Sequence, residues 1–317
     1  MNTLVFIEVA EGKAKKTSLE AVSYAKALNG QVTALVLGTA DAQTVLQIGK
    51  AGADKVLHAP DEKLNQGSIQ AYASSILQAM QTEGTKTLVL ANTSLGTPIA
   101  AKVAAKLQAS IATNVTELPD TSAGFVVKKS IYTGKAFSKI ELKNDYKVIA
   151  IKKNAATIED NGTDVTATLF SPQLTDADFA VKIVSTEKAS GEISLPEANV
   201  VVSGGRGMKG PEHWQPIEEL AKALGAATGC SKPVSDMGWR PHHEHVGQTG
   251  VKVSPQLYFA IGISGAIQHL AGVNSSKCIV VINKDAEAPF FKAADYGIVG
   301  DAFDVLPKLI DAVKASK

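Results

Sequence analysis

Short apolar runs alternate with helical patterns along the first half of the chain. Each run has the length of a strand and is followed by a segment in which apolar residues recur every three or four positions. The pattern predicts strands over residues 4–9, 31–37, 55–58 and 86–91, and helices over residues 16–28, 42–50, 68–81 and 97–107. Pro98 falls near the start of the last helix, where proline is tolerated. Such alternation favours a doubly wound, mostly parallel sheet with helices on both faces.

The alternation of strand and helix patterns ends near residue 121. Strand-like patterns cover residues 125–132, 136–142 and 146–151, with turn residues between them. We expect an antiparallel addition to the sheet here, closed by a further strand over residues 179–185. The polar segment 186–196 carries turn residues and is the expected linker.

After this linker the alternation of strands and helices restarts. We expect strands over residues 199–203, 256–261, 277–282 and 296–299, and helices over residues 211–224, 264–270 and 301–313. Pro307 should kink the last helix. At 317 residues the chain is longer than one typical α/β domain. We therefore predict two α/β domains, residues 1–190 and residues 191–317.

Charge and composition narrow the classes of function. The 32 basic and 31 acidic residues leave a formal net charge of +1, which gives no support to nucleic-acid binding. No apolar run reaches the ~18 residues of a membrane span, so we expect a protein that is not membrane-embedded. Cys230 and Cys278 form no disulfide framework, CxxC pair or thiolate metal site. The N-terminus shows no leader, and we expect a soluble, unexported chain.

A glycine-rich turn follows the strand over residues 199–203. Gly205, Gly207 and Gly210 match the G-x-G-x-x-G spacing, and Arg206 adds a positive charge suited to phosphate. An acid about 20 residues further on, which a nicotinamide dinucleotide site needs, is missing. Taken alone, the turn is about equally compatible with a phosphate site and with a tight strand-to-helix connection that binds no ligand.

Three further segments place small or polar residues beside predicted strands. They are HVGQTG at 245–250, IGISGAIQH at 261–269 and INKDAEAP at 282–289. Asp301 also follows a short strand. In open α/β sheets ligands bind beyond the carboxyl ends of strands, so four such segments together indicate a binding site. His269 alone is more often a hydrogen-bonded core residue than a ligand contact.

These segments carry a resemblance to a known family. The strings SGGRGMKG, VGQTG, SGAIQHLAG, INKDAEAPF and ADYGIVGD resemble the α subunit of electron transfer flavoproteins in order and spacing over residues 198–317. The N-terminal half resembles the family more loosely, through LVFIE, GADKVL and ANTSLGTPIAAKVAAKLQAS. The resemblance implies a Rossmann-like C-terminal domain that binds FAD, and an N-terminal domain that packs on a β subunit.

The resemblance also implies roles for individual residues. Arg206 would contact the FAD phosphates, and Ser231 and Lys232 would lie close to the flavin. The isoalloxazine ring would face Val246, Gly247, Gln248 and Thr249, with the Thr249 hydroxyl near N5. The pyrophosphate would lie against Ser264, Gly265, Ala266, Ile267 and Gln268, with His269 near the pyrimidine edge. The adenosine end would contact Asn283, Asp301 and the backbone of Ala302.

Lys232 departs from the family pattern, because members usually have arginine after the serine of this loop. The positive charge is kept and the planar guanidinium is lost. We expect this to affect the flavin potential more than FAD binding.

By resemblance, the protein is an electron carrier without a catalytic acid or base. Its expected donors are acyl-CoA dehydrogenases of fatty acid β-oxidation or related flavin dehydrogenases, and its expected acceptor is a quinone oxidoreductase. The β subunit is compatible with either AMP or a second FAD. We expect the chain in a bacterial cytoplasm, and a processed mitochondrial chain is also compatible with the sequence.

Three alternatives compete with this interpretation. The segment PHHEH at 241–245 suggests a metal, but His243 and His245 would supply at most two ligands on one face, so we expect none. A NAD-dependent dehydrogenase lacks its ribose-binding acid. A scaffold that has lost its flavin has no need of Arg206, Thr249, His269, Asn283 and Asp301 together.

Overall fold

The computed structural model describes residues 1–134, 136–181, 183–184, 195–196 and 198–316. The chain divides into two compact units, Met1–Thr186 and Glu187–Lys317. Residues 186–194 of the expected linker, and with them the expected boundary after residue 190, lie outside the described residues. Only residues 195–196 of the linker are described.

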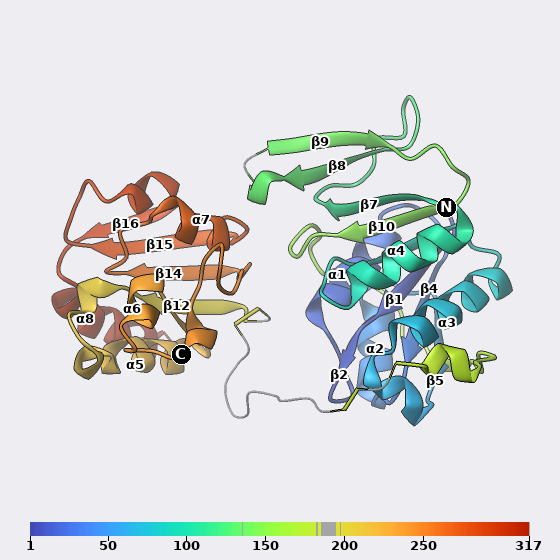
Figure 1. The fold of residues 1–317 in the computed structure, drawn as a ribbon, viewed down its shortest axis with the longest axis horizontal. Coiled ribbons are helices and arrows are strands. Elements are labelled where there is room, and N and C mark those ends of the chain that lie inside the picture. The colour runs from blue at the N-terminus through green and yellow to red at the C-terminus, as the bar shows by residue number, and fades with distance from the viewer. Residues whose placement is uncertain (135, 182, 185–194, 197, 317) are drawn as a thin grey trace. The chain divides into compact units, whose positions relative to one another are not determined.

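The N-terminal unit is built on a nine-stranded sheet of order β11-β5-β4-β1-β6-β10-β7-β8-β9 (Figure 1). Its strands are β1 Thr3–Ile7, β4 Val32–Leu37, β5 Lys55–Ala59, β6 Thr87–Ala91, β7 Ser110–Val115, β8 Val126–Ile131, β9 Ala136–Glu141, β10 Lys147–Ile151 and β11 Ala167–Leu169. The strands from β11 to β7 run parallel, and β8 and β9 are antiparallel additions. A small hairpin, β2 Val9–Ala10 and β3 Lys13–Ala14, follows β1. The mixed α/β sheet with an antiparallel addition is confirmed.

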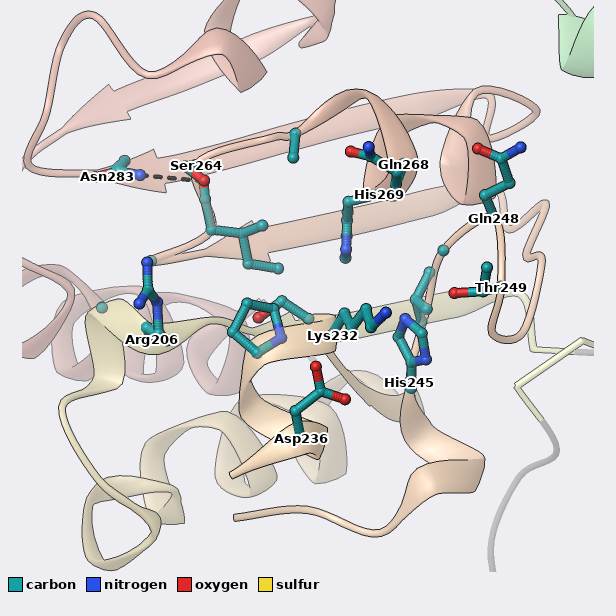
Figure 2. Close-up of a pocket in the computed structure, with 18 of the residues that line it drawn as sticks. Arg206, Lys232, Asp236, His245, Gln248, Thr249, Ser264, Gln268, His269 and Asn283 are labelled. Atoms are coloured by element: carbon teal, nitrogen blue, oxygen red, sulfur yellow. Dashed lines mark hydrogen bonds between the residues drawn. The ribbon is translucent and has the colours of Figure 1, made fainter. Parts of the chain in front are cut away.

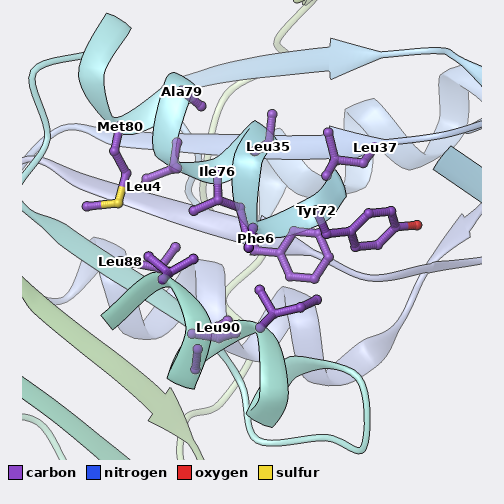
Figure 3. Close-up of a cluster of buried hydrophobic side chains, with 14 of the residues drawn as sticks. Leu4, Phe6, Leu35, Leu37, Tyr72, Ile76, Ala79, Met80, Leu88 and Leu90 are labelled. Atoms are coloured by element: carbon purple, nitrogen blue, oxygen red, sulfur yellow. The ribbon is translucent and has the colours of Figure 1, made fainter. Parts of the chain in front are cut away.

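Helices cover both faces of this sheet because its central strands are apolar on both faces. Leu4 and Phe6 pack with α3 and α4 in one core, which Figure 3 shows, whereas Val5 and Ile7 pack with α1 and α2 in the other. Neighbouring side chains of a strand point to opposite faces, so one strand contributes side chains to both cores. The helices are α1 Lys16–Lys26, α2 Ala42–Lys50, α3 Ile69–Thr82 and α4 Gly96–Leu107.

Three expectations for this unit were wrong. We placed residues 146–151 in the antiparallel addition, but β10 lies between β6 and β7 and is parallel to both. Its residues Val148–Ile151 are buried, as an apolar strand in the middle of a parallel sheet must be. We missed β7, in which only Ala112 and Val115 are buried, and β11, whose three residues are all exposed. The described part of 179–185 contains no strand, and its first residue, Phe179, is the last residue of a 3₁₀ turn, Asp176–Phe179. Residues 182 and 185 are not described.

The C-terminal unit is a five-stranded, fully parallel sheet of order β13-β12-β14-β15-β16. The strands are β12 Val200–Gly204, β13 Ala227–Cys230, β14 Leu257–Ile261, β15 Cys278–Asn283 and β16 Tyr296–Val299. Numbered along the chain, the strand order is 2-1-3-4-5. In this doubly wound order the second strand is added on one side of the first strand, and the third and later strands are added on the other side. The best-known dinucleotide-binding order, 3-2-1-4-5-6, is different.

Two layers cover this second sheet. Helices α5 Gln215–Leu224 and α8 Ala302–Ala315 pack on one face through Ile217, Leu220 and Leu306. On the other face lie the loop around Val246 and the short helix α7 Ile267–Val273. Another short helix, α6 Lys232–Asp236, follows β13.

Local backbone geometry corrects three expectations for this unit. The helix expected from Ser264 begins at Ile267, because Gly265 has a φ of +86° and the Ser264 carbonyl accepts a hydrogen bond from Phe290 N (3.0 Å). The helix expected over 211–224 is a 3₁₀ turn, Pro211–His213, followed by α5. We missed β13 and α6, which are short and contain Gly229 and Pro233.

Candidate functional site

A cavity of about 550 Å³ lies at the carboxyl ends of β12, β13, β14 and β15 (Figure 2). This is the edge of the sheet at which the strand order reverses, between β12 and β14, where ligands bind in doubly wound sheets. Its volume falls in the range of small-molecule sites, about 300–1,000 Å³.

The loops after β12 and β14 approach each other through two glycines. Gly207 N donates to the Gly262 carbonyl at 3.0 Å. A Cβ on Gly207 would lie 2.6 Å from Gly262 Cα, so no larger residue fits without a shift of backbone. This close contact lets Arg206, beside Gly207, line the cavity with an exposed side chain.

The loop after β13 supplies a hydroxyl and two charges. Ser231 is buried, and its N–H donates to the Gly204 carbonyl at 3.0 Å, which ties this loop to β12. Lys232 and Asp236 are the first and last residues of α6, and both line the cavity. Four residues apart on a helix, their side chains lie on the same side.

An ion-paired arginine holds the segment that leads to the VGQTG loop. Arg240 donates to both carboxylate oxygens of the buried Glu244, at 2.9 and 2.6 Å, and to Glu218 of α5 at 2.7 Å. Val246 N then donates to the Cys230 carbonyl at 3.0 Å. The pairing fixes His245, which is 3% exposed and lines the cavity. Burial lowers the pKa of His245, and the nearby His242 lowers it further.

The VGQTG loop packs on the start of α7. Gln248 N donates to the Gln268 carbonyl at 2.8 Å, and Gly247 N donates to the Val251 carbonyl at 3.1 Å. The side chains of Gln248 and Thr249 are exposed and line the cavity. A hydroxyl and an amide are therefore presented by a loop with a defined backbone.

His269 is a buried neutral residue of the cavity wall. Its Nε2 lies 2.8 Å from the hydroxyl of Tyr258, and its Nδ1 has no hydrogen-bond partner among the described residues. Burial lowers the pKa of His269 to about 4, with His245 adding to the shift and the Val246 carbonyl opposing it. The ring is therefore neutral at physiological pH.

Asn283 joins two loops at the far side of the cavity. Its Nδ2 donates to the Ile263 carbonyl at 3.1 Å, and its Oδ1 accepts from Asp285 N at 3.1 Å. Part of its hydrogen-bonding capacity is thus used to shape the cavity.

Twelve of the sixteen residues predicted for the site line this cavity. They are Arg206, Ser231, Lys232, Val246, Gly247, Gln248, Thr249, Ser264, Ala266, Gln268, His269 and Asn283. Chain segments as far apart as residues 206 and 283 thus meet at one edge of one sheet.

Four predicted residues do not line the cavity. Gly265 packs against Phe290, and Ile267 is exposed at the start of α7. Asp301 caps α8 by accepting from Phe303 N at 3.0 Å, and it lies 3.6 Å from Lys209 Nζ. The Phe303 amide and then Lys209 hold the pKa of Asp301 below its usual value. Ala302 is buried at the start of α8.

Sequence reasoning missed seven lining residues: Gly207, Pro233, Asp236, His245, Gly262, Ile263 and Asp285. Five of them, Gly207, His245, Gly262, Ile263 and Asp285, lie inside strings already singled out, so assigning every residue of each string to the site would have found them. Asp236 is the last residue of the missed helix α6, and only its spacing of four from Lys232 points to it.

Other chemistry has less support in the described parts of the chain. They hold no group of three or more His, Cys, Asp or Glu side chains placed to bind a metal. Burial raises the pKa of the Cys230 thiol to about 12, with Glu244 adding to the shift, so this cysteine is not a reactive thiolate. No helix within the described ranges is long and apolar enough to cross a bilayer.

Comparisons with known proteins agree on one family over nearly the whole chain. The family model for the electron transfer flavoprotein domain matches residues 3–177, and that for the electron transfer flavoprotein FAD-binding domain matches residues 194–274. The electron transfer flavoprotein subunit alpha of Bacillus subtilis is 36% identical over 98% of this chain and 97% of its own length. That of Syntrophomonas wolfei is 37% identical over 98% and 99%.

A eukaryotic relative gives the same result. The probable electron transfer flavoprotein subunit alpha, mitochondrial, of Caenorhabditis elegans is 35% identical over 98% of this chain and 93% of its own length. The chain therefore belongs to the electron transfer flavoprotein alpha-subunit family, and its C-terminal unit carries the FAD-binding domain of that family.

Proposed function

We propose that FAD occupies the cavity at the carboxyl ends of β12, β13, β14 and β15, and that this chain carries single electrons as the α subunit of a heterodimer. The observation that carries the proposal is the meeting of four separate motifs at one cavity, in the domain that the FAD-binding family model matches. Asn283 and Asp285 lie beyond the matched residues and still line the same cavity.

The chemistry of the lining residues fits FAD. Arg206 and Lys232 bring two positive charges to a wall that also exposes the Thr249 hydroxyl and the Gln248 amide. A phosphate-bearing, dianionic ligand with polar ring edges needs such charges and hydrogen-bonding groups. His245 and His269 each bury an Nδ1 that has no hydrogen-bond partner among the described residues. FAD supplies the redox chemistry, because its ring accepts and releases electrons one at a time.

Each residue predicted for the site would have a task toward this cofactor, including the four that lie outside the cavity lining. Arg206 binds the phosphates and Lys232 favours negative charge on the ring. Val246 to Thr249 orient the ring, with the Thr249 hydroxyl as a donor. Ser264, Gly265, Ala266, Ile267 and Gln268 offer backbone amides and side chains to the pyrophosphate. His269 presents a neutral imidazole to the pyrimidine edge, and Asn283, Asp301 and the Ala302 backbone hold the adenosine end.

The subunit-alpha names of the relatives support a β-subunit partner, and we propose the electron donors and the acceptor from the resemblance. A β subunit completes the heterodimer, with the N-terminal unit packing on it. Acyl-CoA dehydrogenases or other flavin dehydrogenases donate electrons, and a quinone oxidoreductase accepts them. The protein turns over no substrate of its own. We place it in the cytoplasm of a bacterium, with the mitochondrial matrix, after processing, as the alternative compartment for this chain.

An absorption spectrum of the chain purified with its β subunit tests the proposal. Flavin bands that change through a stepwise anaerobic reduction are expected. Arg206→Glu should lower the FAD content severalfold, whereas Lys222→Glu on α5, outside the cavity lining, should leave it unchanged. A colourless complex that also takes up no added FAD would overturn the proposal in favour of a subunit that has lost its flavin.

A further inference from the structure

Tyr258 is a buried polar residue that no motif predicted. It lies on β14 between apolar neighbours, and its side chain is 0% exposed. Its ring is stacked on Phe290 with centroids 6.4 Å apart, and Phe290 also contacts His269 edge to face at 5.6 Å. These contacts hold the ring of Tyr258 and place its hydroxyl against Nε2 of His269 at 2.8 Å. The cavity itself is lined by His269 and not by Tyr258.

The direction of this hydrogen bond depends on which nitrogen of His269 carries the proton. If Nδ1 is protonated, Nε2 accepts from the Tyr258 hydroxyl, and both polar groups are satisfied. If Nε2 is protonated, it donates to Tyr258, and the tyrosine proton must find another acceptor. A buried donor left without a partner costs about 1–3 kcal/mol, so the surroundings decide between the two forms.

The surroundings favour protonation of Nδ1. Among the described residues the fully buried Tyr258 hydroxyl has one hydrogen-bond partner, Nε2 of His269, so the Tyr258 proton is satisfied only if Nε2 accepts it. Nδ1 of His269 has no partner among the described residues, and because His269 lines the cavity a proton on Nδ1 can be bonded by a group in the cavity.

We propose that Tyr258 is a positioning residue that donates its hydroxyl proton to Nε2 of His269 and so fixes His269 as the Nδ1–H tautomer in the cavity wall. The inference deepens the proposed function, since it rests on the same cavity holding FAD. Tyr258 then sets the orientation of the imidazole and the face that it presents to the cofactor. A hydroxyl can also turn to accept, so the contact survives if His269 gains a proton from solvent.

Nitrogen-15 NMR of the purified complex with labelled histidine side chains tests this inference directly. The chain has six histidines, and the spectrum of His269→Gln identifies the signals of His269. At neutral pH we expect the Nδ1–H form to exceed the Nε2–H form by about tenfold. Tyr258→Phe should reduce this ratio about tenfold.

Tyr24→Phe is the matched control. Tyr24 is equally buried in the N-terminal unit, and its hydroxyl donates to the Glu117 carbonyl at 3.0 Å. This variant should leave the His269 tautomer unchanged. A wild-type His269 in the Nε2–H form overturns the inference, even if Tyr258→Phe does not fold. An unchanged ratio in a folded Tyr258→Phe variant overturns it as well.

The flavin content of the same samples separates the two proposals. Bound FAD together with an Nε2–H tautomer overturns the role of Tyr258 and leaves the proposed function standing. Absent FAD together with an Nδ1–H tautomer overturns the proposed function and leaves the Tyr258–His269 contact as a structural feature.

Discussion

Lys232 lines the cavity at the position where the resemblance to the family leads us to expect an arginine. Its side chain is exposed at the first position of α6 and lines the cavity. A positive charge near a reduced, anionic ring stabilises the reduced form, and solvent weakens the effect at an exposed position. We predict that Lys232→Met lowers the flavin reduction potential by tens of millivolts, whereas Lys232→Arg keeps it close to that of the wild type.

Potentiometric titration of the purified complex measures this shift. Lys222→Met removes a lysine from α5, outside the cavity lining, and should leave the potential unchanged. If Lys232→Met and Lys222→Met give the same potential, the charge of Lys232 does not act on the flavin.

His269 makes the stability of the C-terminal unit depend on pH. Its folded pKa of about 4 lies below the unfolded value of about 6.5, so the unfolded chain binds the proton more readily. The stability is therefore complete above pH 6.5 and falls as the pH drops toward 4. From pH 7 to pH 5 this residue alone should cost about 2 kcal/mol of unfolding free energy.

Urea unfolding followed by tryptophan fluorescence checks this prediction, because Trp214 and Trp239 both belong to the C-terminal unit. His269→Gln should make the loss between pH 7 and pH 5 smaller by about the same 2 kcal/mol. The buried His245 contributes in the same direction, so some loss should persist in the variant. An equal loss in wild type and variant would show that His269 is not held neutral by burial.

At the residue scale, the sequence identified the site residues that lie in glycine-rich strings. Arg206, Thr249 and His269 belong to such strings, and all three line the cavity. Tyr258 was not found, because a tyrosine in an apolar strand looks like any other core residue. Its role depends on the contact with His269 across the fold, which no local pattern contains.

At the scale of elements, the contact between the loops after β12 and β14 makes a direct prediction. Gly262 has a φ of +62°, and a Cβ there would lie 2.9 Å from Gly207 Cα. Gly225, at the end of α5, has almost the same φ of +63° but nothing within 4 Å of a Cβ. Gly225→Ala therefore measures backbone strain alone, about 1 kcal/mol, and Gly262→Ala measures strain plus the clash.

We predict that Gly262→Ala destabilises the C-terminal unit by at least about 1 kcal/mol more than Gly225→Ala. It should also lower FAD affinity, because the two loops move apart at the cavity. Urea unfolding and FAD titration of both variants are the measurements. Equal stabilities and equal affinities would mean that the close contact between the loops is not needed for the site.

Secondary structure was predictable for the amphipathic helix α2 and for the short strand β16, and the bounds of both agree with the expected ones. β10 was identified as a strand and placed in the wrong part of the sheet. Strand order is set by long-range pairing with β6 and β7, which a local pattern does not encode. The start of α7 was misplaced because Gly265 was interpreted as a small helical residue when it adopts a left-handed conformation.

For the whole molecule, the division into two units predicts that FAD stabilises one of them selectively. Every residue lining the cavity belongs to Glu187–Lys317. A ligand that binds only the folded state stabilises it by about 2.7 kcal/mol when its free concentration is 100 times Kd. We expect this gain in the tryptophan-monitored unfolding of the C-terminal unit.

Hydrogen exchange of the complex, with and without FAD, locates the effect. Protection should increase in the loops after β12 to β15 and in α7, where the lining residues lie, while the amides of β1, β4 and β6 exchange at unchanged rates. Arg206→Glu serves as the control, because added FAD should leave its exchange nearly unaltered. Protection that rises equally in the N-terminal sheet would mean that the two units unfold as one cooperative body, and the assignment of the FAD effect to one unit would be wrong.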